Sequence, residues 1–149
     1  MKPIIVAEGE ARALNVIGTA ITIRIHGRDT GGALSVVESV DHPGEGPPPH
    51  IHERESETFQ VLEGEYEFMC GGERFTVQKG ATIFAPSGQP HGYRCISRTA
   101  GRLSVAITPA GFEKFFEEVG ALSAAEQEIP RVLEIATKYG LQFLPPQAA

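Results

Sequence analysis

The chain has 149 residues, of which 41% are hydrophobic and 21% charged, which is the length and composition of one globular domain. Its formal net charge is -6 and no stretch concentrates Lys and Arg, so we expect no nucleic-acid partner. The two cysteines, Cys70 and Cys95, do not make a disulfide scaffold, and the apolar run at residues 4–7 is too short for a signal peptide or a membrane span. We therefore expect a single cytoplasmic domain, residues 1–149, with no membrane partner.

The N-terminal part of the chain is divided into short strands. From residue 16 to residue 26 apolar residues alternate with polar or small ones, which is the period of a half-buried strand. A second strand is predicted at residues 33–40, after a Gly-Gly turn. The next segment, residues 41–49, is rich in proline, which lacks the backbone N–H that a strand ladder needs. It predicts an ordered loop that leads to His50.

Further strands follow at close intervals. Residues 57–62, 65–70 and 74–78 are separated by Glu63-Gly64 and by the hairpin turn Gly71-Gly72, and this pattern predicts a meander of neighbouring strands. Three more strands are predicted at residues 81–85, 91–96 and 103–108. Eight or more short strands with regular turns predict an all-β sandwich or barrel over about residues 16–108.

The period changes to that of a helix after Pro109. Four apolar residues have the spacing i, i+3, i+4 and i+7 of one helix face, namely Phe112, Phe115, Phe116 and Val119. Gly120 marks the end of this helix, and the Ser123 to Glu126 spacing predicts a capping box at the start of a second one that ends near Gly140. The two C-terminal helices thus occupy about residues 110–140, and residues 141–144 predict an extended tail that packs back on the barrel.

Three histidines and one glutamate form a candidate metal site. His50 and His52 are two residues apart, so on a strand both imidazoles project from the same face. Glu57 can supply a carboxylate from the next strand and His91 a third imidazole from a distant one. Three nitrogens and one oxygen suit one divalent transition metal, Fe, Mn, Ni, Co, Cu or Zn, and a six-coordinate ion would keep two positions open for substrate.

The spacing of these residues resembles the two consensus motifs of the cupin superfamily. The first motif is matched by Gly44, His50, His52, Glu57 and Gly64, and the second by Gly80, Pro86, Gly88 and His91. The resemblance implies a double-stranded β-helix, the jelly-roll barrel of single-domain cupins, with His50, His52, Glu57 and His91 as metal ligands. One position departs from the pattern, because Cys95 stands where the second motif usually ends in Asn. We interpret Cys95 as a small buried residue and not as a ligand.

Strand parity predicts which residues line the barrel around the ion. Phe59 and Val61 share the face of Glu57, while Tyr93 and Cys95 share that of His91. These four residues predict a substrate pocket that is apolar apart from the metal and a phenol, which suits a flat hydrophobic substrate. The Phe-rich helix is interpreted as packing on the barrel, where it can also cover the mouth.

The short chain with its Phe-rich helix is also similar to cupins grouped with flavonol (quercetin) 2,3-dioxygenases. This resemblance implies a metal-dependent dioxygenase acting on a small aromatic substrate, with Glu57 as the base that takes the enol proton. That role would require burial to raise the pKa of Glu57. Two alternatives stay open: a metal-dependent isomerase or lyase acting on a small hydroxy or keto compound, and a non-catalytic cupin that binds a small molecule. By family analogy we expect a homodimer that pairs through a sheet edge or exchanges an N-terminal strand, for which residues 3–6 are available.

Overall fold

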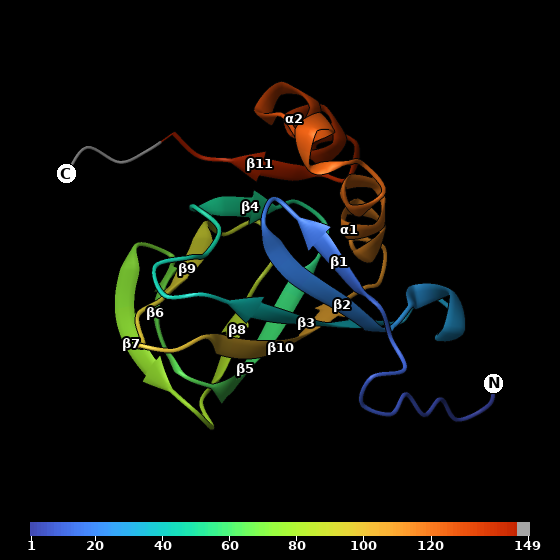
Figure 1. The fold of residues 1–149 in the computed structure, drawn as a ribbon, viewed down its shortest axis with the longest axis horizontal. Helices are drawn as coiled ribbons and strands as arrows, with labels where there is room; N and C mark the ends of the chain where they lie inside the picture. The colour runs from blue at the N-terminus through green and yellow to red at the C-terminus, as the bar shows by residue number, and fades with distance from the viewer. Residues whose placement is uncertain (146–149) are drawn as a thin grey trace.

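The computed structural model describes residues 1–145, which form two antiparallel β-sheets around one hydrophobic core (Figure 1). The first sheet contains, in spatial order, β1 (Ala13–Val16), β2 (Thr19–Ile25), β3 (Ser35–Asp41), β10 (Gly101–Thr108), β5 (Ser56–Glu63) and β8 (Thr82–Ala85). The second contains β11 (Leu141–Phe143), β4 (His50–His52), β9 (His91–Cys95), β6 (Glu65–Cys70) and β7 (Glu73–Gln78). The predicted fold class, an all-β double-stranded β-helix followed by two helices, is confirmed.

The strand predicted at residues 16–26 is a hairpin in the structure. Val16 of β1 lies opposite Thr19 of β2, so Ile17 and Gly18 form a two-residue turn between them. Both turn residues have positive φ, 51° at Ile17 and 84° at Gly18, which is the turn type whose twist matches that of a hairpin. The alternation in the sequence holds within β2. It gives no sign of the chain reversal at Ile17 and Gly18, because that turn takes only two residues.

The predicted meander is wrong at one of its two turns. The β6–β7 hairpin forms at Gly71-Gly72, whereas β5 and β6 do not pair and lie in different sheets. Gly64 allows the chain to pass from one sheet to the other at this point. Its φ is 87°, and a Cβ here would lie 2.9 Å from the Cα of Gly101. A glycine turn in the sequence therefore gave no sign that the following strand changes sheets.

The core fills the space between the two sheets. Along β3 every second residue is buried and the residues between are half-buried, which is the pattern of a strand that turns one face inward. The largest fully buried side chains of the core are aromatic or branched, and they come from both sheets: Phe59, Tyr66, Phe68, Leu103 and Ile107. Most of the buried residues are hydrophobic, so the smaller set of buried polar residues is where a functional site is to be sought.

Two helices lie together beside the barrel, next to β1 and β11 (Figure 1). The first, α1 (Glu113–Gly120), is where the sequence predicts it. The capping box of Ser123 and Glu126 is present, but it caps a short 3-10 helix, η2 (Ala124–Glu126), and α2 (Ile129–Lys138) begins after it. The buried Glu113 carboxylate accepts hydrogen bonds from the backbone N–H groups of Gly27 and Gly111, at 2.9 and 2.7 Å. These bonds fix the start of α1 against the short 3-10 helix η1 (Gly27–Asp29).

The extended tail predicted at residues 141–144 is the strand β11, which pairs with β4 so that Leu141 lies opposite His52 and Phe143 opposite His50. The C-terminal strand thus covers the outer edge of the strand that carries two of the predicted ligands. Neither helix within residues 1–145 has the length and apolar character that are needed to cross a membrane.

Candidate metal centre and cavity

The four predicted ligands come together in the structure. His50 and His52 lie on β4, His91 on β9 and Glu57 on β5, and one possible ligand atom from each lies within 4.8 Å of the others. His50 and His91 are direct partners in the β4–β9 ladder. Glu57 reaches the same point from the opposite sheet. All four residues are at most 6% exposed, so the cluster is shielded from bulk water.

The local hydrogen bonding prepares His50 for a metal. Its Nδ1 lies 2.8 Å from the carbonyl oxygen of Pro48. A carbonyl can only accept, so Nδ1 carries the proton and Nε2 offers its lone pair to the cluster. Burial, together with repulsion from His91 and His52, lowers the pKa of His50 to about 3. The ring is therefore neutral at pH 7, which is the form that binds metals.

Glu57 lies between the other two imidazoles. Its Oε2 is 2.8 Å from Nε2 of His91 and 3.4 Å from Nε2 of His52. Burial by itself would raise the pKa of Glu57, but the adjacent His52 and His91 hold this pKa well below its ordinary value. The raised pKa expected for a catalytic base is therefore not what the structure shows, because the histidines outweigh the desolvation. Glu57 is a carboxylate, which is the form required of a ligand.

Polar atoms just outside the cluster also fit a metal. Within residues 1–145, His52 Nδ1, His91 Nδ1 and Glu55 Oε2 are buried without a hydrogen-bond partner. Glu55 Oε2 and His52 Nδ1 are 3.8 Å apart, roughly 1 Å longer than a hydrogen bond. A histidine that binds a metal through Nε2 commonly donates Nδ1–H to a carboxylate. The donor set and its surroundings therefore fit a divalent first-row ion. The sequence analysis missed Glu55, although it follows His52 by three residues.

A cavity of about 220 Å³ opens from the cluster into the barrel. His50, His52 and Glu57 line one side of it, and Phe59 and Tyr93 lie in its wall as predicted. Val61 and Cys95 do not line it, which corrects the predicted pocket. Both point inward and are at most 1% exposed, but they lie further along their strands, within the packed core.

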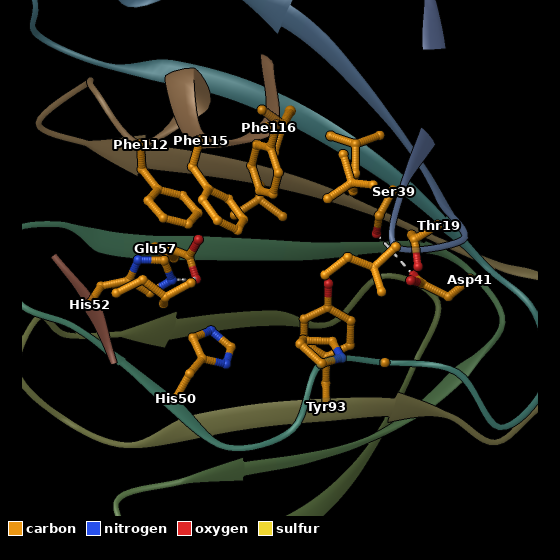
Figure 2. Close-up of a pocket in the computed structure, with 18 of the residues that line it drawn as sticks. Thr19, Ser39, Asp41, His50, His52, Glu57, Tyr93, Phe112, Phe115 and Phe116 are labelled. Carbon is orange, nitrogen blue, oxygen red and sulfur yellow. Dashed lines mark hydrogen bonds and ion pairs between the residues drawn. The ribbon is translucent and has the colours of Figure 1, made fainter. Parts of the chain in front are cut away.

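Aromatic side chains form much of the cavity wall. Phe112, Phe115 and Phe116 line it, as Figure 2 shows, so the helix stripe interpreted as packing also borders the cavity. The Phe112 ring stands edge-on to the His52 ring, with 4.4 Å between centroids. Phe112 precedes α1, so the position of this helix is linked directly to a predicted metal ligand.

The cavity has a second polar region that the sequence analysis missed. Ser39 and Asp41, on the inward face of β3, line it together with Thr19 of β2. In Figure 2 Asp41, Ser39 and Thr19 lie on one side of the cavity, while His52 and Glu57 lie on the other. The signal was present in the sequence, since Ser35, Val37, Ser39 and Asp41 share one strand parity. We call Ser39, Asp41 and Thr19 the Asp41 end of the cavity, and His50, His52, Glu57 and His91 the metal end.

Comparisons with known proteins support the family resemblance that the sequence motifs indicate. A family model described as "Cupin domain" matches residues 37–107. The chain is 30% identical over 105 residues to Quercetin 2,3-dioxygenase of Bacillus subtilis (strain 168), a match that covers 70% of this chain and 31% of that protein. The chain thus spans about a third of the length of this curated relative.

Solved structures share the fold. KdgF from Halomonas sp. superposes with a TM-score of 0.68 at 21% identity, covering 76% of this chain and 99% of that one. The polyketide cyclase RemF from Streptomyces resistomycificus gives a TM-score of 0.60 at 26% identity, covering 72% and 80%. The likeness to KdgF is one of fold alone.

Proposed function

We propose that this chain, which belongs to the cupin superfamily, is a metal-dependent dioxygenase that acts on a small aromatic compound of the flavonol type. The observation that carries this proposal is the joining of a three-histidine, one-glutamate donor set to a cavity with aromatic walls. The similarity to quercetin 2,3-dioxygenase supports it. The fold by itself does not, because one scaffold serves many reactions.

Each group at the site has a task in such a reaction. An ion held by His50, His52, Glu57 and His91 would supply Lewis-acid and redox chemistry at the metal end. The Glu57 carboxylate, whose pKa the adjacent imidazoles hold low, can accept a hydrogen bond from the hydroxyl of a substrate placed against it and so orient that group. The phenylalanines hold a flat ring and exclude water, which strengthens the electrostatic interactions inside the cavity.

A second candidate is a metal-dependent isomerase or lyase that acts on a small hydroxy or keto compound. Two observations favour it: the 26% identity to the polyketide cyclase RemF and the buried carboxylate of Asp41, which adds a polar group to the far wall. Such a reaction consumes no oxygen. Oxygen uptake therefore separates the two candidates.

The test begins with elemental analysis of protein purified without added metal or an affinity tag. The protein is then mixed anaerobically with a flavonol, and oxygen is admitted while flavonol absorbance and dissolved oxygen are recorded. We expect close to one first-row metal ion per chain and a loss of flavonol absorbance matched mole for mole by oxygen uptake. The His91→Ala variant is the control and should show neither metal nor uptake. A metal-loaded protein that consumes no oxygen would contradict the dioxygenase and favour the isomerase, lyase or binding roles.

A further inference from the structure

Asp41 is a buried carboxylate in which one oxygen accepts hydrogen bonds and the other has no partner among residues 1–145. It is the last residue of β3 and is 1% exposed. Its Oδ2 accepts hydrogen bonds from the Tyr66 hydroxyl at 2.7 Å and from the Ser39 hydroxyl at 2.9 Å. Its Oδ1 is buried without a hydrogen-bond partner among residues 1–145. A buried acceptor in this state is unfavourable, and more so when it is charged.

Asp41 has hydroxyl partners but no ion-pair partner in the described part of the chain. No Lys, Arg or His side chain within residues 1–145 forms an ion pair with Asp41. Burial raises the pKa of Asp41, against the opposing effect of the hydrogen bonds from Tyr66 and Ser39. Since both hydroxyls donate to Oδ2, they hold the side chain in one orientation and fix Oδ1 as a free acceptor.

The same cavity contacts Asp41 and the metal end. Tyr93 lies between them along the wall (Figure 2), and the other surfaces there are apolar, including Val37, Val105 and Phe59. Its volume of about 220 Å³ exceeds that of the engineered cavity of ~150 Å³ known to bind benzene. A molecule that fills the cavity is therefore larger than one benzene ring, and a compound of two fused rings matches the cavity volume better.

We propose that Asp41 determines substrate specificity by accepting, at Oδ1, a hydrogen bond from a hydroxyl group on the substrate end remote from the metal. The substrate class is then a two-ring hydroxylated aromatic, with vicinal hydroxy and keto oxygens at the metal end and a hydroxyl at the Asp41 end. This assignment rests on the proposed function for its metal-end chemistry. The hydrogen bond to Asp41 is a separate feature that binding alone can measure.

The test is anaerobic titration calorimetry of the protein as purified with four ligands. These are 3-hydroxychromone, its 6-hydroxy and 7-hydroxy derivatives, and the methyl ether of the better-binding derivative. We expect one hydroxylated derivative to bind about tenfold or more tightly than both 3-hydroxychromone and its own methyl ether, as a hydrogen bond to a buried acceptor that otherwise has no partner implies. The methyl ether is the matched control, because it keeps the oxygen and removes only the donated hydrogen.

The variant Asp41→Asn replaces the free acceptor by an amide while keeping the size of the side chain. Tyr66 and Ser39 can donate to its carbonyl oxygen, which leaves an N–H₂ donor in the place of Oδ1. The advantage of the hydroxylated ligand should fall to less than threefold, with metal content unchanged. The variant Asp29→Asn makes the same chemical change at an exposed site and should keep the full advantage. If Asp41→Asn does not fold, the ligand series on the natural protein still decides.

Failure of this assignment differs from failure of the proposed function. Equal affinity for all four ligands would overturn the role of Asp41, as would a tenfold preference that persists in Asp41→Asn. Absence of binding by any of the four would overturn the proposed substrate class. Tight, Asp41-dependent binding with no oxygen uptake would refute the dioxygenase and leave the Asp41 contact standing.

Discussion

The two polar ends of the cavity are built differently. At the metal end, four buried side chains from both sheets turn their donor atoms toward a common point. At the Asp41 end, a single carboxylate is held by two neutral hydroxyls and has an oxygen to spare. The first arrangement can hold a cation, and the second can accept a further hydrogen bond. One cavity thus offers two opposite kinds of recognition.

Unpartnered polar atoms are concentrated at these two ends. Within residues 1–145 five buried side-chain N or O atoms have no hydrogen-bond partner, and four of them belong to His52, His91, Glu55 and Asp41. Folded proteins pair nearly all such groups, so each unpaired group calls for an explanation, and a bound metal or ligand is one. The following predictions separate the two ends.

The largest effect is expected from His91→Ala at the metal end. Removing one imidazole should reduce bound metal from about one ion per chain to less than a tenth, because a first-row ion depends on its full donor set. Where the ion is present at several hundred times its dissociation constant, its loss lowers the free energy of unfolding by about 3–4 kcal/mol. Elemental analysis and thermal melting measure both changes. His42→Ala is the control, since His42 is exposed on the neighbouring loop, and full metal content in His91→Ala would refute the ligand assignment.

The next effect is expected at the Asp41 end, from Tyr66→Phe. This change removes the 2.7 Å hydrogen bond to Asp41 and leaves a buried carboxylate with one donor fewer. The free energy of unfolding should fall by about 1–3 kcal/mol, with metal content unchanged. Chemical denaturation measures the first and elemental analysis the second. Tyr139→Phe removes a similar bond of 2.7 Å to the partly exposed Glu118 and should lower the free energy of unfolding by less than Tyr66→Phe does, because water can replace the lost bond. Loss of metal in Tyr66→Phe would show that the two ends are not independent.

A smaller effect of opposite sign is expected from Ile17→Asn. Ile17 has φ of 51°, which a β-branched residue adopts only at a cost, and its side chain lines the cavity. The substitution creates Asn-Gly, the pair that this turn type prefers, so the free energy of unfolding should rise by about 1 kcal/mol. Affinity for a chromone ligand should fall, since an apolar wall is lost. Unchanged or reduced stability would mean that the apolar contacts of Ile17 outweigh its backbone strain.

The smallest effect on the site is expected from Cys95→Ser. The thiol of Cys95 contacts the Ser97 hydroxyl at 3.3 Å and the carbonyl of Thr99 at 3.8 Å, so it belongs to neither end. Metal content and ligand affinity should stay within about a factor of two of the natural protein. A large loss of metal measured by elemental analysis would show that Cys95 acts on the metal end.

The metal end was predictable from the sequence, for a local physical reason. Strand alternation places His50 and His52 on one face whatever the rest of the chain does. The motif spacing added Glu57 and His91 to the predicted ligands, and the structure places the four side chains together. Alternation was less informative about Val61 and Cys95. It correctly predicted that both side chains point into the barrel. It carries no information on how far along the barrel a residue lies, and both residues lie beyond the cavity.

The amino-acid sequence by itself determined the strand-rich barrel, the two C-terminal helices and the four candidate ligands, because alternation, glycine turns and ligand spacing act over a few residues. Tertiary structure decided the rest. Asp41 lies on β3 and Tyr66 on β6, which belong to opposite sheets, and no spacing in the chain relates them. Their hydrogen bond exists because the turn at Gly64 sends β6 into the second sheet. Tertiary structure also decides the low pKa of Glu57, since this pKa depends on imidazoles that reach the carboxylate across the barrel.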